Sequence, residues 1–174
     1  MKIKYLEEGE EIPSLEDDMG AILFPDIQTY SWVDEIKVML DEGAIMPTRG
    51  HREDAGFDLY APKNMVTKYL WKNDSVTIDT GVHMLLTPGT AGILISKSGL
   101  NVNHNITNTG LIDAFYTGSI KVKLYNHGSE RYKVEPGDKI SQLVIVPIYT
   151  PKLILTDKLP KTERANRGFG STGR

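Results

Sequence analysis

The stretch Val76-Thr77-Ile78-Asp79-Thr80-Gly81-Val82-His83-Met84 alternates apolar residues with more polar ones. A period of two is typical of a strand with one buried face. The same period returns at residues 120–124 and 132–134, and the run 140–149 is typical of a buried strand. Turn-forming pairs separate these segments, namely Pro88-Gly89, His127-Gly128 and Pro136-Gly137. Many short strands divided by turns predict an all-β barrel or sandwich.

The composition is that of one globular domain with a hydrophobic core. The chain has 174 residues, of which 40% are hydrophobic and 25% charged. It has no apolar run of about 18 residues, and its N-terminus turns acidic before a signal-peptide core could form. We therefore expect a soluble, cytoplasmic protein without a membrane partner. Zero cysteines exclude a disulfide framework, a thiolate nucleophile and a Cys-ligated metal, and the four histidines form no His-x-x-x-His pair.

Charge divides the chain into an acidic arm and a basic body. Residues 1–42 hold three basic and twelve acidic residues, a balance of −9, whereas residues 43–174 hold seventeen basic and eleven acidic, a balance of +6. A basic body suits a polyanionic ligand such as a nucleotide. No run of Lys and Arg exceeds two residues, so we expect no stable nucleic-acid binding.

The arm is expected to contain one short helix over residues 31–42. Ser31 followed by Asp34 resembles a capping box, and Gly43 offers a C-terminal stop. One face of that helix would carry Val33, Ile36, Met39 and Leu40. The expected organisation is an acidic extension over residues 1–43, a β domain over 44–160 and a glycine-rich tail over 161–174. The tail is either a frayed terminus or a flap that wraps phosphate oxygens while Phe169 stacks on a base.

Five segments, taken together and in order, resemble the trimeric dUTPase family over about residues 44–174. They are Ala55-Gly56-Phe57-Asp58-Leu59-Tyr60-Ala61, Ser96-Lys97-Ser98-Gly99-Leu100, Gly110-Leu111-Ile112-Asp113-Ala114-Phe115-Tyr116-Thr117-Gly118, Gly137-Asp138-Lys139-Ile140-Ser141-Gln142-Leu143 and residues 164–173. The resemblance implies a distorted antiparallel β-barrel of the jelly-roll-like, β-clip type. It also implies a homotrimer with sites between subunits, a Mg²⁺ cofactor, and hydrolysis of dUTP to dUMP and pyrophosphate.

The third segment implies the catalytic residue. Gly110 and Gly118 bracket an expected hairpin, and Asp113 and Tyr116 lie three residues apart, where a turn could present both to one pocket. Taken alone, Asp113 could begin a turn and Tyr116 could pack on a strand. In the family this Asp holds the attacking water as a general base, and this Tyr lies under the deoxyribose and excludes a 2′-hydroxyl.

The resemblance assigns the remaining site residues. Asp58 corresponds to the carboxylate that the family links to magnesium through water. In the family, backbone groups of the hairpin read uracil. The implied substrate-binding positions are Lys97, Ser98, Gly99, Thr107, Asn108, Gly110, Ile112, Tyr116, Lys121, Gln142, Arg164, Phe169, Gly170, Ser171 and Thr172.

The chain departs from the family's pattern at four positions. Lys97 stands where the family usually has Arg, which keeps the charge and loses the bidentate fork. Thr107 stands where many members have Asn, while Ala165 and Arg167 replace the first two glycines of the tail motif. Fewer glycines stiffen that segment.

Two alternative functions compete with dUTP hydrolysis. The dCTP deaminases share the fold and carry a catalytic Glu where this chain has Lys123, which cannot transfer a proton as a carboxylate would. Deamination is therefore disfavoured. The second alternative is a dUTPase-like binding protein that engages a protein partner, with residues 1–42 as the point of contact.

Overall fold

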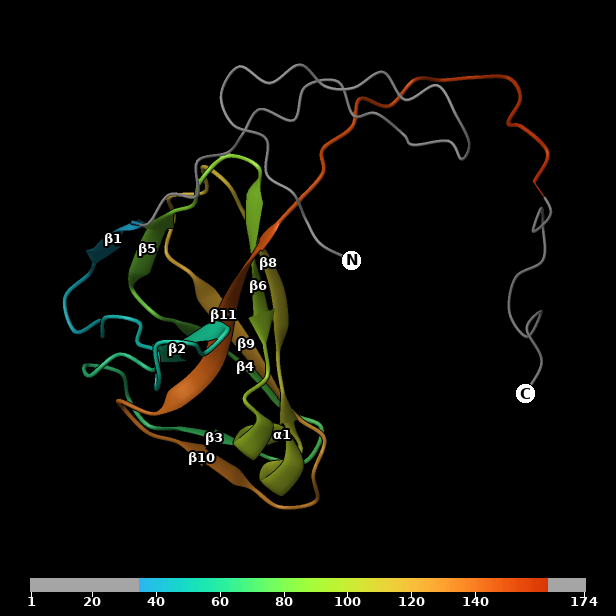
Figure 1. The fold of residues 1–174 in the computed structure, drawn as a ribbon. Coiled ribbons are helices and arrows are strands. Elements are labelled where there is room, and N and C mark those ends of the chain that lie inside the picture. The colour runs from blue at the N-terminus through green and yellow to red at the C-terminus, as the bar shows by residue number, and fades with distance from the viewer. Residues whose placement is uncertain (1–34, 163–174) are drawn as a thin grey trace. The chain divides into compact units, whose positions relative to one another are not determined.

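A computed structural model of the chain describes residues 35–162, and Figure 1 shows their arrangement. These residues form eleven strands and one short helix. Every strand pair in this part of the chain is antiparallel. The all-β prediction is therefore confirmed.

The largest sheet has four strands and contains three of the five sequence segments. Its order is β2 (Gly56–Tyr60), β11 (Lys139–Pro147), β6 (Thr90–Ile95) and β8 (Thr109–Asp113). The apolar run of β11 suits its central place, where it pairs with β2 on one side and β6 on the other. This sheet brings the residues of segments distant in sequence to neighbouring strands (Figure 1).

The other strands form one three-stranded sheet and two pairs. The three-stranded sheet has the order β4 (Ser75–Asp79), β9 (Lys121–Asn126) and β7 (Ile106–Thr107). Along β9 exposed and buried residues alternate without exception, as its period of two predicts. The pairs are β1 (Lys37–Leu40) with β5 (Val82–Leu85), and β3 (Lys68–Leu70) with β10 (Tyr132–Val134).

One continuous core lies between these sheets. It draws on most of the predicted strands, and its fully buried large side chains are Leu59, Leu70, Leu86, Leu94, Ile106, Ile120, Leu124, Ile140, Leu143, Val82, Val122 and Val134. The helix α1 (Ser98–His104) contributes no buried residue and lies against the surface.

Within residues 35–162 the strands do not close into a barrel. The four-stranded sheet ends at β2 on one side and β8 on the other, and the three-stranded sheet ends at β4 and β7. The β-rich, jelly-roll-like part of the prediction holds, whereas closure of the strands into a barrel does not.

The predicted helix over residues 31–42 is wrong where the structure describes it. Lys37–Leu40 form β1, which pairs with β5. Ile36 and Val38 pack against the core, while Met39 is 59% and Leu40 is 40% exposed. A short apolar run fits a helix and a strand almost equally well. Here the segment forms a strand because its backbone can pair with β5. Residues 31–34 lie outside the described residues.

The expected hairpin between Gly110 and Gly118 is also wrong. Its two sides are β8 and β9, which belong to different sheets. After β8 the chain turns at Asp113, where the Tyr116 N–H donates to the Asp113 carbonyl at 3.2 Å. The chain then crosses to the three-stranded sheet. Buried Ile120 fixes this crossing, since its backbone forms hydrogen bonds with Thr80 and Val82.

Candidate active site

Asp58 is the centre of a charged cluster that joins three of the sequence segments. It lies on β2, opposite Gln142 of β11, and its side chain is 7% exposed. Lys97 Nζ lies 2.5 Å from Asp58 Oδ1, and Lys139 Nζ lies 2.7 Å from Asp58 Oδ2. Gln142 Nε2 donates weakly to Asp58 Oδ1 at 3.4 Å. The sheet therefore brings the predicted residues Asp58, Lys97 and Gln142 together.

The two lysines keep Asp58 ionised. Burial raises the pKa of the Asp58 carboxyl, but hydrogen bonds and Coulomb attraction from Lys139 and Lys97 outweigh it and bring the pKa below its ordinary value. The hydrogen bond to Asp58 and the charge of Asp58 raise the pKa of Lys139 in turn. Both shifts favour the charged forms of Asp58 and Lys139.

Ser98 and Gly99 follow Lys97 as the first two residues of α1. A side chain at Gly99 would meet nothing within 4 Å, so the space beside its Cα is open. Backbone N–H groups in the first turn of a helix have no partner inside the helix. Both predicted residues are thus placed next to the charged cluster with groups that could bind a phosphate oxygen.

Asp113 and Tyr116 lie together on a turn at the end of β8. Asp113 is exposed, and Tyr116 is 44% exposed and donates its hydroxyl to the Ser119 carbonyl at 3.1 Å. Phe115 between them has φ of 65° and is 68% exposed. A positive φ is uncommon for a bulky residue and is strained. The turn presents both predicted residues on one surface.

Two contacts fix the segment after this turn. Ser119 Oγ donates to Asp79 Oδ1, and this bond is the main cause that lowers the pKa of Asp79. The His83 ring bonds to the Thr117 carbonyl at 2.8 Å and to Asp41 Oδ2 at 3.2 Å, and these two bonds raise the pKa of His83. The loop that follows Asp113 is therefore anchored to β4 and β5.

Within one chain Asp113 lies far from the Asp58 cluster. Asp113 pairs with Ala91 on β6, whereas Gln142 pairs with Ile95, four residues further along β6. That step is about 14 Å at 3.4 Å per residue, and the three strand spacings from β8 to β2 add about 14 Å across the sheet. The two groups are therefore about 20 Å apart.

The remaining predicted residues of the β domain differ in exposure. Asn108 is buried, with its amide donating to Ser141 Oγ at 2.8 Å and its N–H to Ser96 Oγ at 2.8 Å. Ile112 is also buried, and a Cβ at Gly110 would lie 2.9 Å from Leu94 Cδ1. Asn108, Ile112 and Gly110 can therefore shape this region but offer few free side-chain groups.

Thr107 and Lys121 are tied to neighbouring side chains. Thr107 Oγ1 bonds to His127 Nε2 at 2.8 Å, and Lys121 Nζ lies 3.8 Å from Asp79 Oδ2. The predicted tail residues Arg164, Phe169, Gly170, Ser171 and Thr172 lie outside the described residues.

Sequence reasoning missed Lys139. Its ammonium contacts the same carboxylate as Lys97, and it lies three residues before Gln142 in the fourth segment. The sequence did contain a signal for this residue, because Lys139 is a basic residue in the fourth segment, which also holds the predicted phosphate-binding residue Gln142. What the sequence could not show is that β11 carries that cation to Asp58.

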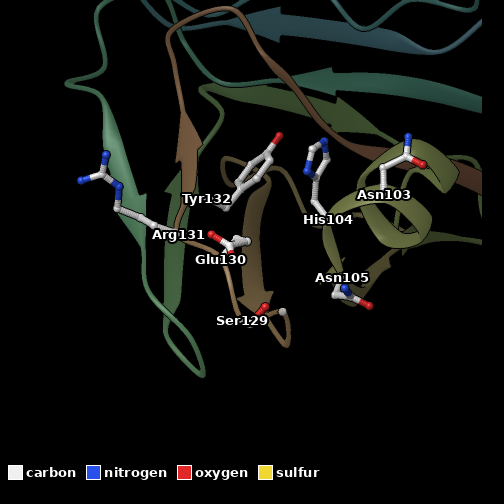
Figure 2. A pocket seen from close by; sticks show the side chains of 8 residues that line it. Asn103, His104, Asn105, Ser129, Glu130, Arg131 and Tyr132 are labelled. Atoms are coloured by element: carbon white, nitrogen blue, oxygen red, sulfur yellow. The ribbon is translucent and has the colours of Figure 1, made fainter.

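A separate concavity lies at the C-terminal end of α1. It has a volume of about 110 Å³ and is lined by Asn103, His104, Asn105, Gly128, Ser129, Glu130, Arg131 and Tyr132. Figure 2 shows His104 and Tyr132 side by side and the Arg131 side chain extending away from them. The Arg131 guanidinium instead lies 4.7 Å from the centre of the Tyr69 ring. None of the predicted site residues lines this concavity.

Comparison with known proteins identifies the family. The sequence model of the dUTPase family matches residues 42–173. The chain belongs to the dUTPase family. It is 40% identical over 137 residues to the deoxyuridine 5'-triphosphate nucleotidohydrolase of Clostridium acetobutylicum, which covers 77% of this chain and 92% of that protein. A probable deoxyuridine 5'-triphosphate nucleotidohydrolase of Schizosaccharomyces pombe is 38% identical over 135 residues, or 77% of this chain and 94% of that protein.

Solved dUTPases of staphylococcal phages share this fold. The dUTPase of Staphylococcus bacteriophage 80alpha, solved with dUPNHPP, has a TM-score of 0.73 and 30% identity over 81% of this chain and 99% of that one. It is described as a phage dUTPase that controls transfer of virulence genes. A variant of the phage phi11 dUTPase, with a TM-score of 0.66 and 29% identity over 74% of this chain and all of that one, is described with a structural Mg(II) ion.

Among residues 35–162 no group of three or more His, Cys, Asp or Glu side chains could hold a metal ion. The single helix in the same range, α1, is too short to cross a membrane.

Proposed function

We propose that Asp113 is the general base with which this dUTPase hydrolyses dUTP to dUMP and pyrophosphate. Hydrolysis of dUTP is the activity of the family to which the chain belongs. The observation that carries the assignment is the exposed Asp113 on a turn with Tyr116, in the third family segment. A carboxylate so exposed can hold a water molecule and accept its proton as the water attacks the α-phosphorus.

The other residues bind the substrate in this proposal. Tyr116 lies against the deoxyribose and excludes a 2′-hydroxyl by sterics. Ser98, Gly99, Gln142 and Arg164 donate to phosphate oxygens and offset the charge that develops as pyrophosphate leaves. Backbone groups of residues 107–112 and 121 read uracil, and Phe169 covers the base.

We also propose a homotrimer in which neighbouring subunits complete each site. The separation of about 20 Å between Asp113 and the Asp58 cluster supports it, because one substrate cannot reach both in one chain. The segment after β11 supplies a second argument. Residues 148–162 form no strand, and Leu153, Ile154 and Leu155 are 90%, 79% and 98% exposed. A run of exposed apolar residues of this kind is typical of a surface that another subunit covers.

Magnesium belongs to the proposal as the family's cofactor, and the phage phi11 relative is described with a Mg(II) ion. Its expected link to Asp58 meets an obstacle in the described residues. Both oxygens of Asp58 already bind lysine ammonium groups. We therefore derive no catalytic step through the metal.

A cytoplasmic location and a protein partner at residues 1–42 remain part of the proposal. The location follows from the substrate, which is an intracellular nucleotide. A regulatory partner is suggested by the phage 80alpha relative, described as controlling gene transfer. Deleting residues 1–34 separates the two roles. It keeps β1 and the contact of Asp41 with His83, so hydrolysis should persist while binding of a partner to the arm is lost.

Release of pyrophosphate from a panel of nucleotides tests the activity. The wild-type chain should act on dUTP and leave dCTP, dTTP and UTP largely intact, because backbone recognition selects uracil and Tyr116 selects deoxyribose. A Tyr116→Ala variant should raise hydrolysis of UTP relative to dUTP. Ammonia release from dCTP would contradict the proposal and favour deamination.

A further inference from the structure

The carboxylate of Asp58 is enclosed, while the two ammonium groups that bind it reach the surface. The Asp58 side chain is 7% exposed, whereas those of Lys97 and Lys139 are 23% and 45% exposed. The carboxylate is therefore shielded from an incoming ligand, and the lysines are not.

The cluster carries a net positive charge at this surface. Two ammonium groups against one carboxylate leave a charge of +1. A carboxylate offers about four lone-pair positions, and Lys97, Lys139 and Gln142 occupy three of them. The carboxylate of Asp138, next to Lys139 in the sequence, is engaged elsewhere, since it accepts a hydrogen bond from the Glu135 N–H at 2.7 Å.

This arrangement does not fit a divalent cation. A magnesium ion bound through Asp58 would lie beside two ammonium groups, and like charges at such distances repel strongly. If one lysine moved off Asp58 to make room for the magnesium ion, its ammonium group would lie beside that ion and would have lost its carboxylate partner. The same arrangement suits an anion with several oxygens.

We propose that Asp58 is a positioning residue that holds Lys97 and Lys139 as a two-ammonium receptor for the triphosphate, with Lys139 as a further phosphate-binding residue. The proposal rests on the proposed function, since that function supplies the triphosphate. A lysine on its flexible four-carbon stem loses rotamer freedom when it binds. Asp58 fixes both stems before the ligand arrives, which lowers the entropic cost of binding.

Lys139→Gln and Lys133→Gln form a matched pair for the test. Lys133 is 48% exposed and lies 2.7 Å from Glu135, close to the 45% exposure and 2.7 Å distance of Lys139. Binding of inorganic tripolyphosphate to the full-length chain is measured by calorimetry with metal chelated. Lys139→Gln should weaken binding about tenfold, as loss of one charge-assisted hydrogen bond implies. Lys133→Gln should change it by less than about twofold.

Asp58→Asn separates the positioning role from a role at the metal. If Asp58 only positions the two lysines, the magnesium concentration that gives half-maximal activity of Asp58→Asn should stay within about twofold of that of wild type. The loss caused by Lys139→Gln should also shrink from about tenfold to less than about threefold in the Asp58→Asn background, because Lys139 is no longer held there.

Equal tripolyphosphate binding by Lys139→Gln and Lys133→Gln would overturn the receptor. A rise of tenfold or more in the magnesium requirement of Asp58→Asn would assign Asp58 to the metal instead. The two lysine variants decide the question even if Asp58→Asn fails to fold, because both lysines are exposed. A chain that binds tripolyphosphate through Lys139 and releases no pyrophosphate from dUTP would contradict the proposed function and leave the receptor standing.

Discussion

Asp113 combines exposure with a fixed backbone, which a general base requires. The turn bond from Tyr116 and the anchors at Ser119 and Thr117 hold its segment, while its side chain remains accessible. Replacing an exposed carboxylate with an amide removes little packing. Its function should therefore change much more than its stability.

Asp113→Asn is expected to lower kcat by roughly 10²–10⁴-fold, because an amide cannot accept the proton of the attacking water. Steady-state pyrophosphate release gives kcat, and binding of a non-hydrolysable dUTP analogue shows whether the site is intact. The melting temperature should stay within a few degrees of wild type. Wild-type turnover in this variant would remove Asp113 from the mechanism.

Asp58 should make stability depend on pH in the acid range. Its pKa in the folded state lies below the ordinary aspartate value of 3.8, because hydrogen bonds and Coulomb attraction from Lys139 and Lys97 outweigh burial. A lowered folded-state pKa means that the unfolded chain binds the proton more readily. The stabilisation is therefore complete well above pH 3.8 and is lost as the pH falls through the lower, folded-state pKa.

Denaturant unfolding at a series of pH values, from neutral pH down into the acid range, measures this effect. The Asp58→Asn variant should show a smaller loss of unfolding free energy on acidification than wild type. An Asp157→Asn variant provides the control, since Asp157 lies in the exposed segment after β11. Parallel curves for wild type and Asp58→Asn would contradict the lowered pKa.

At the scale of elements, glycine turns set how the strands connect. Gly81 has φ of 66° and divides the alternating stretch into β4 and β5. A Cβ there would lie 3.0 Å from Ala44 Cβ and 3.1 Å from Asp41 Cβ. Gly137, with φ of 86°, precedes β11, and a Cβ there would meet nothing within 4 Å.

Gly81→Ala and Gly137→Ala should therefore differ in stability. Both place a Cβ in the left-handed region, which costs about 1–2 kcal/mol. Only Gly81→Ala adds close contacts with the loop that follows β1, so its unfolding free energy should fall further by about 1 kcal/mol or more. Denaturant unfolding compares the two, and an equal loss would mean that the loop at Asp41 and Ala44 yields without cost.

The strands were predictable where one face is buried, because burial enforces the period of two. Val122, Leu124 and Ile78 all face the core as their spacing predicts. The strand at Lys37–Leu40 was not predictable. Its short apolar run fits both the helical and the strand period, and its pairing with β5 is a contact between segments distant in the sequence. The same limit applies to Gly110 and Gly118, since sheet membership of β8 and β9 depends on partners far along the chain.

The candidate site was predictable as a set of residue types and not as a geometry. Family resemblance pointed to Asp58, Lys97 and Gln142, and the sheet brings them together. Resemblance could not show that Asn108 is enclosed with Ser141 or that Lys139 completes the pairing of Asp58. Those facts depend on strand register, which a single sequence does not contain.

At the scale of the whole molecule, the separation of Asp113 from the Asp58 cluster leads to a test of the assembly. A chain with Asp113→Asn lacks the base, and a chain with Lys97→Gln and Lys139→Gln lacks the proposed phosphate receptor. Each should be nearly inactive alone. If neighbouring subunits supply the two parts, a mixed trimer contains some sites in which both parts are intact.

Random reassembly of equal amounts should place both intact parts in about one quarter of the sites, because each part is intact in half of the subunits. The two variants are unfolded together in denaturant, refolded, and assayed for pyrophosphate release. Each variant refolded alone provides the control for residual activity. Recovery of about a quarter of wild-type activity would require that Asp113 and the lysines of one site come from different chains. If each chain instead contained a complete site, every site in the mixture would lack one part, and the mixture would be no more active than the two controls.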